Sequence, residues 1–457
     1  MMKKNIVTTG LLTLLLASNS LHAAVSEAEA ARLGQDLTPM GSERAANASG
    51  TIPAWDGGIA PDAGAIDERG FLADPFAGEP PLFIITAANV SEHADKLSPG
   101  QLAMFQRYPD TYRIPVYPSS RTHPISDDVA AATRRCATSV TLVPASNGIA
   151  NYENCRKGFA FPIPSEGLHV IWNHIVRYRG DTVRRQVVQA TPLTNGSYTL
   201  VRFEDEVAFP WAVSGLSESA SNNLLLYFKQ RVVAPSRLAG NVLLVHETID
   251  QVVEPRSAWV YNAGQRRVRR APQVAYDGPG TASDGTRTTD NFDMYSGAPD
   301  RYDWRLVGKQ EMYISVNNNR LASPSVKYDD ILQAGHINQD LTRYELRRVW
   351  HIEATLKSGM RHIYHRRVMF VDEDSWQVAV ADHYDGRGAL WRVGEGHQYV
   401  HYAQGLAGYV AETLYDTLSG RYVAIGMNNE ESQAFQFGHP VSAAEFTAGA
   451  LRSSGVR

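Results

Sequence analysis

The sequence is poor in cysteine and in long hydrophobic runs. Its 457 residues include two cysteines, and after the N-terminal segment no apolar run approaches the roughly 20 residues that span a bilayer. The net charge is −4, and a mildly acidic chain argues against nucleic acid as the main partner. There is also no GxSxG nucleophile elbow, no P-loop and no GxGxxG turn between a strand and a helix. We therefore expect neither an enzyme nor a bound cofactor.

Histidines gather in the last third of the chain and raise the alternative of a metal site, at His351, His362, His365, His383, His397 and His401. His397 and His401 are four residues apart, a spacing that places two ligands on one face of a helix. The surrounding GHQYVHY carries strand and turn signals, however, and no HExxH pattern accompanies it. We expect no metal, and a metal-dependent or other hydrolase stays as an alternative function.

The first 23 residues have the pattern of a cleaved signal peptide. Lys3 and Lys4 are followed by an apolar run over residues 6–17 and by small residues up to position 24. No cysteine lies near the cleavage point, so we expect an exported, periplasmic protein without a lipid anchor. Loss of the two lysines changes the net charge from −4 to −6, because the segment holds no Asp or Glu. An uncleaved membrane anchor is the alternative.

The two cysteines predict a disulfide. Cys136 and Cys155 bracket a polar loop, and an even pair in an exported chain most often forms a bridge. Closing a loop of this size stabilises the fold by about 3 kcal/mol in the chain-entropy view. A catalytic cysteine is the alternative.

Residues 24–165 predict an irregular, partly helical N-terminal extension. Ser26 is placed to cap a helix, with Glu29 at the capping-box position, and Ser98 followed by Pro99 predicts a second helix start. Elsewhere single apolar residues stand among Gly, Ala, Pro and Asp. Such a segment has no core of its own, and we expect it to drape over the rest of the chain.

Residues 166–440 predict a helix followed by strand after strand. Apolar residues at three- and four-residue spacing, including Trp172, favour a helix from Glu166 to Tyr178. Hairpin signals then recur, with Asn195-Gly196 the strongest, and 219–230 fits either a helix turn or a strand. The stretch 344–393 reads as a meander with a turn at Gly359 and a strand starting at Trp376.

The fold class that follows is mainly β. We predict a large curved antiparallel sheet, or half-open β-barrel, closed by covering helices. Residues 441–457 are expected to form a C-terminal helix or tail. A curved sheet with an aromatic-rich inner face suits an apolar chamber for a lipid-like ligand. The predicted lining is Trp172 as a lid with Trp259, Tyr261, Trp350, Ile352, Leu356, Trp376, Val378 and Val380. Ordinary core packing is the alternative for each of them.

A run of arginines follows the predicted strand that carries Trp259. Arg266, Arg267, Arg269 and Arg270 surround a lone Val268 on the return strand of a hairpin. They predict a cationic rim that contacts an anionic head group or a partner, with a solvated sheet face as the alternative. The segment 278–293, rich in Gly, Thr and Asp, predicts a long flexible loop.

Several strings resemble a known family. The resemblance rests on five strings: LTPMGSERAANASGTIPAWDGG, GLHVIWNHIVRYRGD, PRSAWVYNAGQRRVRRAP, RYDWRLVGKQEMYISVNN and the meander string from RRVWHIEATL to ADHYDGRG. In these strings the chain resembles a proteobacterial family of exported proteins of unknown function. That family is labelled outer-membrane lipoprotein-sorting-like. The resemblance implies a fold similar to the Lol periplasmic lipoprotein carriers. It also implies a resistance-nodulation-division type exporter and an outer-membrane barrel as partners.

The sequence thus predicts a periplasmic carrier for a lipid or other hydrophobic molecule. The alternative from a different class is an adaptor or structural subunit of an exporter, whose cavity is filled by its own side chains. In that case the arginine strand and the 278–293 segment form the working surface.

Overall fold

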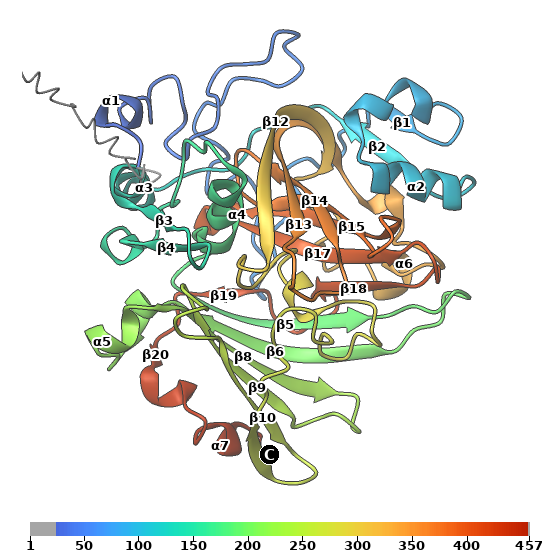
Figure 1. Ribbon diagram of the computed structural model, residues 1–457. Coiled ribbons are helices and arrows are strands. Elements are labelled where there is room, and N and C mark those ends of the chain that lie inside the picture. Colours follow the sequence, from blue (N-terminus) through green and yellow to red (C-terminus); the bar gives the residue numbers. More distant parts are fainter. Residues whose placement is uncertain (1–23, 456–457) are drawn as a thin grey trace, which may run out of the picture.

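The computed structural model describes residues 24–455, and the predicted signal peptide lies outside them. Sixteen strands join into one large sheet that does not close on itself (Figure 1). Most neighbouring strands are antiparallel, while β2 (Ile114–Tyr117) runs parallel to β13 (Tyr344–Leu356), so the sheet is mixed. The predicted mainly β fold built on a large sheet is confirmed, with this one parallel pair added.

The large sheet consists of two half-sheets that meet where β18 pairs with β5. The C-terminal half-sheet contains β12 (Tyr302–Ser315), β13, β14 (Arg366–Asp372), β15 (Val378–Tyr384), β16 (Leu390–His401), β17 (Leu406–Asp416) and β18 (Tyr422–Met427). The middle half-sheet contains β5 (Thr182–Ala190), β6 (Leu200–Ala208), β8 (Leu224–Ala234), β9 (Val242–Thr248), β10 (Ser257–Asn262) and β11 (Arg267–Arg270). Figure 1 shows the first, with β12 in yellow and the other strands in orange and red, above the second, which is mostly green.

The remaining elements lie around these half-sheets. The helices are α1 (Glu27–Ala30), α2 (Pro99–Arg107), α3 (Asp127–Ser139), α4 (Gly167–Val176), α5 (Glu218–Ser221), α6 (Tyr328–Ile331) and α7 (Leu451–Gly455). The short strands are β1 (Phe83–Ile85), β3 (Thr141–Val143), β4 (Gly148–Ala150), β7 (Val213–Ser214), β19 (Gln436–Phe437) and β20 (Val441–Ser442). No helix within residues 24–455 is long and apolar enough to cross a membrane.

Helix α4 covers the inner face of the C-terminal half-sheet. Its sequence is almost wholly buried, and it packs against β12 and β13. The main hydrophobic core joins Ile171 and Trp172 of α4 to Ile352 of β13 and also to Leu226 of the middle half-sheet. One continuous core therefore includes α4 and residues of both half-sheets.

The meander follows the predicted alternation, with one correction. Ile352 and Ala354 are buried while Glu353 and Thr355 are less so, and Gly359 takes a positive φ of 81° in the turn. Trp376 does not begin a strand. It lies in the turn before β15 with a φ of 56°, and its indole is fully buried. The side chain of Trp376 points into the core because of the turn conformation, and the alternation of a strand does not predict such a turn.

The N-terminal extension is held by caps, a disulfide and two strands. Ser26 forms the predicted capping box, although the first helix ends at Ala30, and Ser98 caps α2 as predicted, with Gln101 completing a capping box there as well. Cys136, within α3, and Cys155 form the predicted disulfide. Strands β1 and β2 join the edge of the large sheet. The domain boundaries proposed from the sequence stay a prediction.

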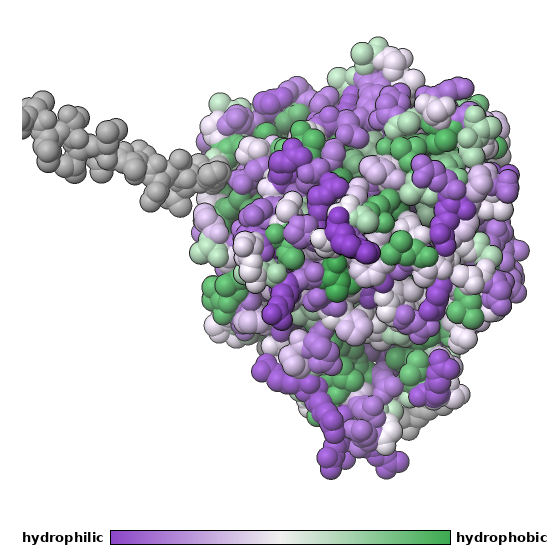
Figure 2. Space-filling model, turned by 45° about the vertical axis from the view of Figure 1, so that its right-hand side comes forward, coloured by the Kyte–Doolittle hydropathy of each residue, from purple (hydrophilic) through white to green (hydrophobic). Residues whose placement is uncertain are grey.

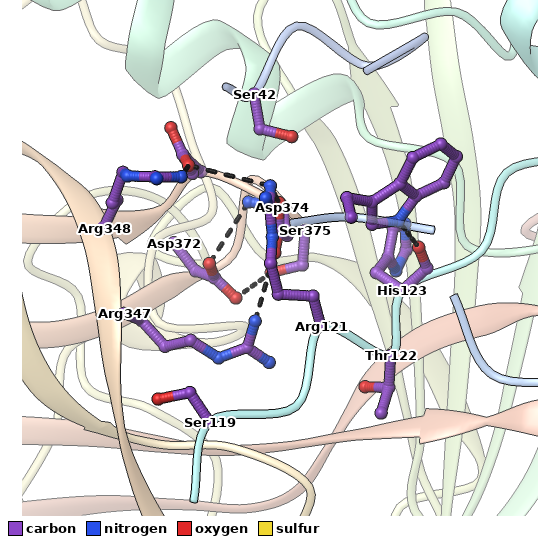
Figure 3. Close-up of polar contacts among 12 residues, drawn as sticks. Ser42, Ser119, Arg121, Thr122, His123, Arg347, Arg348, Asp372, Asp374 and Ser375 are labelled. Atoms are coloured by element: carbon purple, nitrogen blue, oxygen red, sulfur yellow. Dashed lines mark hydrogen bonds and ion pairs between the residues drawn. The ribbon is translucent and has the colours of Figure 1, made fainter. Parts of the chain in front are cut away.

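A buried ion network fastens the extension to the sheet (Figure 3). Arg121 reaches Asp374 at 2.6 Å, and Arg347 of β13 reaches the other oxygen of Asp374 at 3.0 Å. Burial opposes ionisation of Asp374, but the two guanidiniums outweigh it and lower the pKa to about 2. Arg348 likewise meets Glu373 at 3.1 Å. Because each of these buried charges has an ion-pair partner, we interpret the network as a structural link between the N-terminal extension and the sheet.

Of two further segments, the structure resolves an ambiguity in the first and differs from the expected flexible loop in the second. The ambiguous 219–230 becomes helix α5 followed by strand β8. The segment 278–293 is not a bare loop, because Arg287, Thr288, Asp290 and Asn291 are buried in it. Asp290 ties it to the sheet through Arg367 of β14 at 2.6 Å.

Candidate functional site

A cavity of about 110 Å³ lies on the inner face of the middle half-sheet. Its floor comes from β6, β8 and β9, its side from the end of helix α4, and its roof from residues 274–297. The apolar lining comprises Trp172, Ile175, Val207, Leu225, Leu226, Phe228, Leu243, Val245, Val274, Phe292 and Tyr295. A cavity of about 150 Å³ in another protein holds one benzene. This one is smaller, so by itself it admits a few methylenes without rearrangement, and a larger ligand extends beyond it.

The floor follows from strand pairing. Val207 of β6 faces Phe228 of β8, which faces Val245 of β9, so three apolar side chains form one cross-strand row. A bulge between Leu224 and Leu226 adds an extra residue to β8, and both Leu225 and Leu226 then reach the cavity. The alternation of β8 and β9 thus makes this face apolar.

Charged groups form the walls. Asp293 binds both Arg177 and Arg179 at 2.5 Å, and Arg256 binds Glu247 at 2.5 Å. Burial works against ionisation of Asp293, but the two arginines outweigh it and lower its pKa to about 2. The cavity therefore combines an apolar floor with walls of fixed charge, an arrangement that can hold an amphiphilic molecule.

A second cavity of about 110 Å³ adjoins the first. The two share Arg179, Val207, Phe292 and Asp293, and the second extends along β17 and β18 to Tyr409 and Ile425. The Phe292 ring and the Arg179–Asp293 ion pair therefore lie in the wall between them. A ligand longer than one cavity must pass these side chains.

Of the nine lining residues predicted from sequence, Trp172 borders a described cavity. Its indole donates a hydrogen bond to the carbonyl of Asn147 at 2.7 Å, which fixes the ring. The structure places the other eight elsewhere, and their ligand-binding role stays a prediction. The main core around α4 contains four of them, Trp350, Ile352, Trp376 and Val378. Val380 packs in a separate cluster with Phe370, and Leu356 is half-buried at the end of β13. The last two, Trp259 and Tyr261, pack with Leu451 of α7.

The four arginines of the predicted rim lie on the exposed β10–β11 hairpin. Figure 2 shows strongly hydrophilic residues at the lower end of the molecule, where Figure 1 places this hairpin. Arg270 stacks over Trp259 at 5.6 Å and donates to the Ser257 hydroxyl at 3.1 Å. That these four arginines contact a head group or a partner stays a prediction.

Three of the six histidines, His383, His397 and His401, are buried in the sheet. His397 and His401 lie on strand β16, and burial lowers the pKa of His397 to about 3 and that of His401 to about 4. His397 hydrogen-bonds Ser315 at 2.8 Å. Within the part of the chain that the structure describes, no group of three or more His, Cys, Asp or Glu is placed to hold a metal ion.

Sequence reasoning missed most of this site. The pattern Leu226, Phe228, Gln230 on β8 was a usable signal, because alternate positions of a strand share one face. No local signal shows that Arg287 and Phe292 lie over that face, because their segment has no periodic pattern.

An open sheet bent around one helix, with cavities on its inner face, defines a cavity-bearing β protein. The chain belongs to DUF1329, a family of proteins of unknown function that matches residues 84–452. The family resemblance seen in the sequence is thereby confirmed. An uncharacterized protein of Pseudomonas aeruginosa, PA3922, is 60% identical over 454 residues, covering 99% of each chain.

Two solved structures can be set beside it. A putative outer membrane lipoprotein-sorting protein domain from Vibrio parahaemolyticus is 12% identical, with a TM-score of 0.41 over 60% of this chain and 92% of that one. A DUF1329 family protein from Desulfovibrio piger is 16% identical, with the same TM-score and coverage. At such values the likeness does not extend to ligand or activity.

Proposed function

We propose that this protein is an exported binding or carrier protein for a small hydrophobic or amphiphilic molecule. The cavity on the middle half-sheet carries this proposal, since an apolar floor with a few fixed polar groups is the usual form of a ligand site. Burying methylenes on such a floor contributes about 0.8 kcal/mol each. The family resemblance adds an inner-membrane exporter and an outer-membrane barrel as the proposed machines between which the ligand passes.

Filling the cavity tests the proposal. Val245 is 4% exposed and lines the floor, so Val245→Trp places an indole where the ligand is expected. Val253 is 79% exposed, and Val253→Trp is the matched control. We expect Val245→Trp to weaken binding of the neutral probe N-phenyl-1-naphthylamine at least tenfold, with Val253→Trp unchanged. Native mass spectrometry with lipid extraction then identifies any co-purifying ligand.

The same assay separates the two places where a ligand has been proposed. Trp350→Leu alters the predicted site on the C-terminal half-sheet and leaves the cavity untouched. Loss of probe binding in a folded Trp350→Leu protein, with normal binding in Val245→Trp, contradicts the cavity assignment. Circular dichroism of each variant checks that it is folded.

An adaptor role is the second proposal, and one observation favours it. Arg266, Arg267 and Arg269 are exposed and make no ion pair with the described residues. Such a strip suits a partner with an acidic surface. Replacing all three with Gln is expected to abolish co-purification of the partner exporter, while probe binding in the cavity stays normal.

A further inference from the structure

Arg287 stands out among the charged groups of the cavity. It is 7% exposed and lines the cavity from the roof segment. Its Nη1 donates a hydrogen bond to the Thr288 carbonyl at 3.4 Å, and its Nε has no partner among the described residues. No described carboxylate lies within ion-pair distance of it. The other two arginines of the lining are paired, Arg179 with Asp293 and Arg256 with Glu247.

Asp205 and Glu412 are the carboxylates that act on Arg287 through space, but neither forms an ion pair with it. Asp205 already accepts hydrogen bonds from Gln230 at 2.9 Å and from Arg185 at 3.2 Å. Glu412 accepts one from the backbone N–H of Met294, and burial raises its pKa to about 7. A buried charge without a partner costs several kcal/mol, so this position favours an anion from outside the chain.

The roof is shaped to hold the guanidinium in place. A Cβ at Gly280 would lie 2.7 Å from both Cγ and Cζ of Arg287, so glycine leaves the room that the side chain occupies. On another side the Phe292 ring lies 5.7 Å from Cζ. Gly280 and Phe292 both line the cavity as well. The Arg287 side chain therefore lies between Gly280 and the Phe292 ring in the lining of the cavity.

We propose that Arg287 binds the head group of the ligand, and that the ligand is a hydrophobic molecule with a single acidic group, such as a carboxylate. One guanidinium without an ion pair matches one negative charge, and its planar fork matches a carboxylate. This inference rests on the proposed carrier function and names its ligand class. The apolar row Val207, Phe228 and Val245 then receives the hydrocarbon part.

Octanoate and octanol test the head group, because they share a chain and differ in charge. Dissociation constants are measured at pH 8 by displacement of N-phenyl-1-naphthylamine. Because a hydrogen bond to a charged group contributes about 1.5–3 kcal/mol, we expect wild type to bind octanoate at least about tenfold more tightly than octanol. Arg287→Met should remove that preference by weakening octanoate binding, so that the two molecules bind alike. Arg269→Met, which alters an exposed arginine outside the cavity, should change neither.

A second readout does not depend on ligand binding. Removing an unpaired buried charge relieves its desolvation, so Arg287→Met is expected to raise the melting temperature of the empty protein. Gly280→Ala, which keeps the charge but displaces it, should weaken octanoate binding alone. A lowered melting temperature for Arg287→Met makes the arginine structural and overturns the proposal.

The possible failures are distinct. Equal binding of octanoate and octanol, unaffected by Arg287→Met, overturns the head-group assignment and leaves the carrier function intact. Binding of neither molecule by folded wild type counts against the carrier function itself, and the head-group proposal falls with it.

Discussion

The two half-sheets present similar apolar inner faces but are covered differently. Over the C-terminal half-sheet lies helix α4, whose side chains meet Ile352, Met369 and Val378 in a continuous core. Over the middle half-sheet lies the irregular segment 274–297, and beneath it a cavity stays open. A helix presents side chains every turn and fills the space against a sheet, whereas a segment bound to itself by turns and hydrogen bonds does not. The cover, more than the sheet, decides where a ligand fits.

The largest expected difference between the halves is in packing. Trp376 is fully buried, and its indole donates to the carbonyl of Met40 at 2.9 Å and stacks on Trp350. Trp376→Ala should lower the free energy of unfolding by about 3–5 kcal/mol. Leu243→Ala, on the cavity floor, should cost about 1 kcal/mol, because one side of Leu243 already faces empty space. Urea unfolding of both variants measures this, and equal losses would remove the distinction.

The next effect concerns the anchoring of the roof. Asp290 accepts hydrogen bonds from Arg367 at 2.6 Å and His362 at 3.1 Å, and Arg367 is wholly buried. Asp290→Asn leaves Arg367 without its carboxylate and should cost about 3 kcal/mol. Hydrogen exchange over residues 274–297 should rise with it.

The same segment offers a matched control. Asp284 also pairs with an arginine, Arg421 at 3.1 Å, but its side chain is 68% exposed. Asp284→Asn should change stability by less than about 1 kcal/mol, because water screens exposed pairs. Unchanged exchange in Asp290→Asn would mean that other contacts hold the roof.

The smallest expected effect is a pH dependence in the cavity wall. Because Arg177 and Arg179 depress the pKa of Asp293 to about 2, its contribution is full above about pH 4 and is lost as the pH falls through 2. The pH-dependent part should be about 2 kcal/mol. Unfolding of wild type and Asp293→Asn at pH 6, 4 and 3 measures it. A stability difference that stays constant over this range argues against the assigned ionisation.

The sequence predicted most of the fold from local patterns. Ser26 and Ser98 start helices because their side chains satisfy free backbone N–H groups, and Cys136 with Cys155 close a loop. Alternation located β13, and three- and four-residue spacing located α4. Trp376 shows the limit, since a turn with positive φ reverses what alternation implies.

The candidate site was much less predictable. Trp172, the predicted lid, does border a cavity, because helix spacing shows which face is apolar, and its role toward a ligand stays a prediction. The strands were assigned apolar faces, but which of those faces stays open depends on what covers it. Arg287 and Phe292 lie in a segment without periodicity, so nothing local joins them to Phe228, which is far away in the sequence.

By itself the sequence determined that this chain forms hairpins around one amphipathic helix and a disulfide, because capping, turn and alternation preferences act between neighbouring residues. Only the tertiary structure decided that α4 fills one half-sheet while the 274–297 segment leaves the other hollow. It also decided that one arginine stays unpaired in that hollow. Packing density and charge pairing depend on residues far apart in the chain, and their contacts exist only once the sheet has bent.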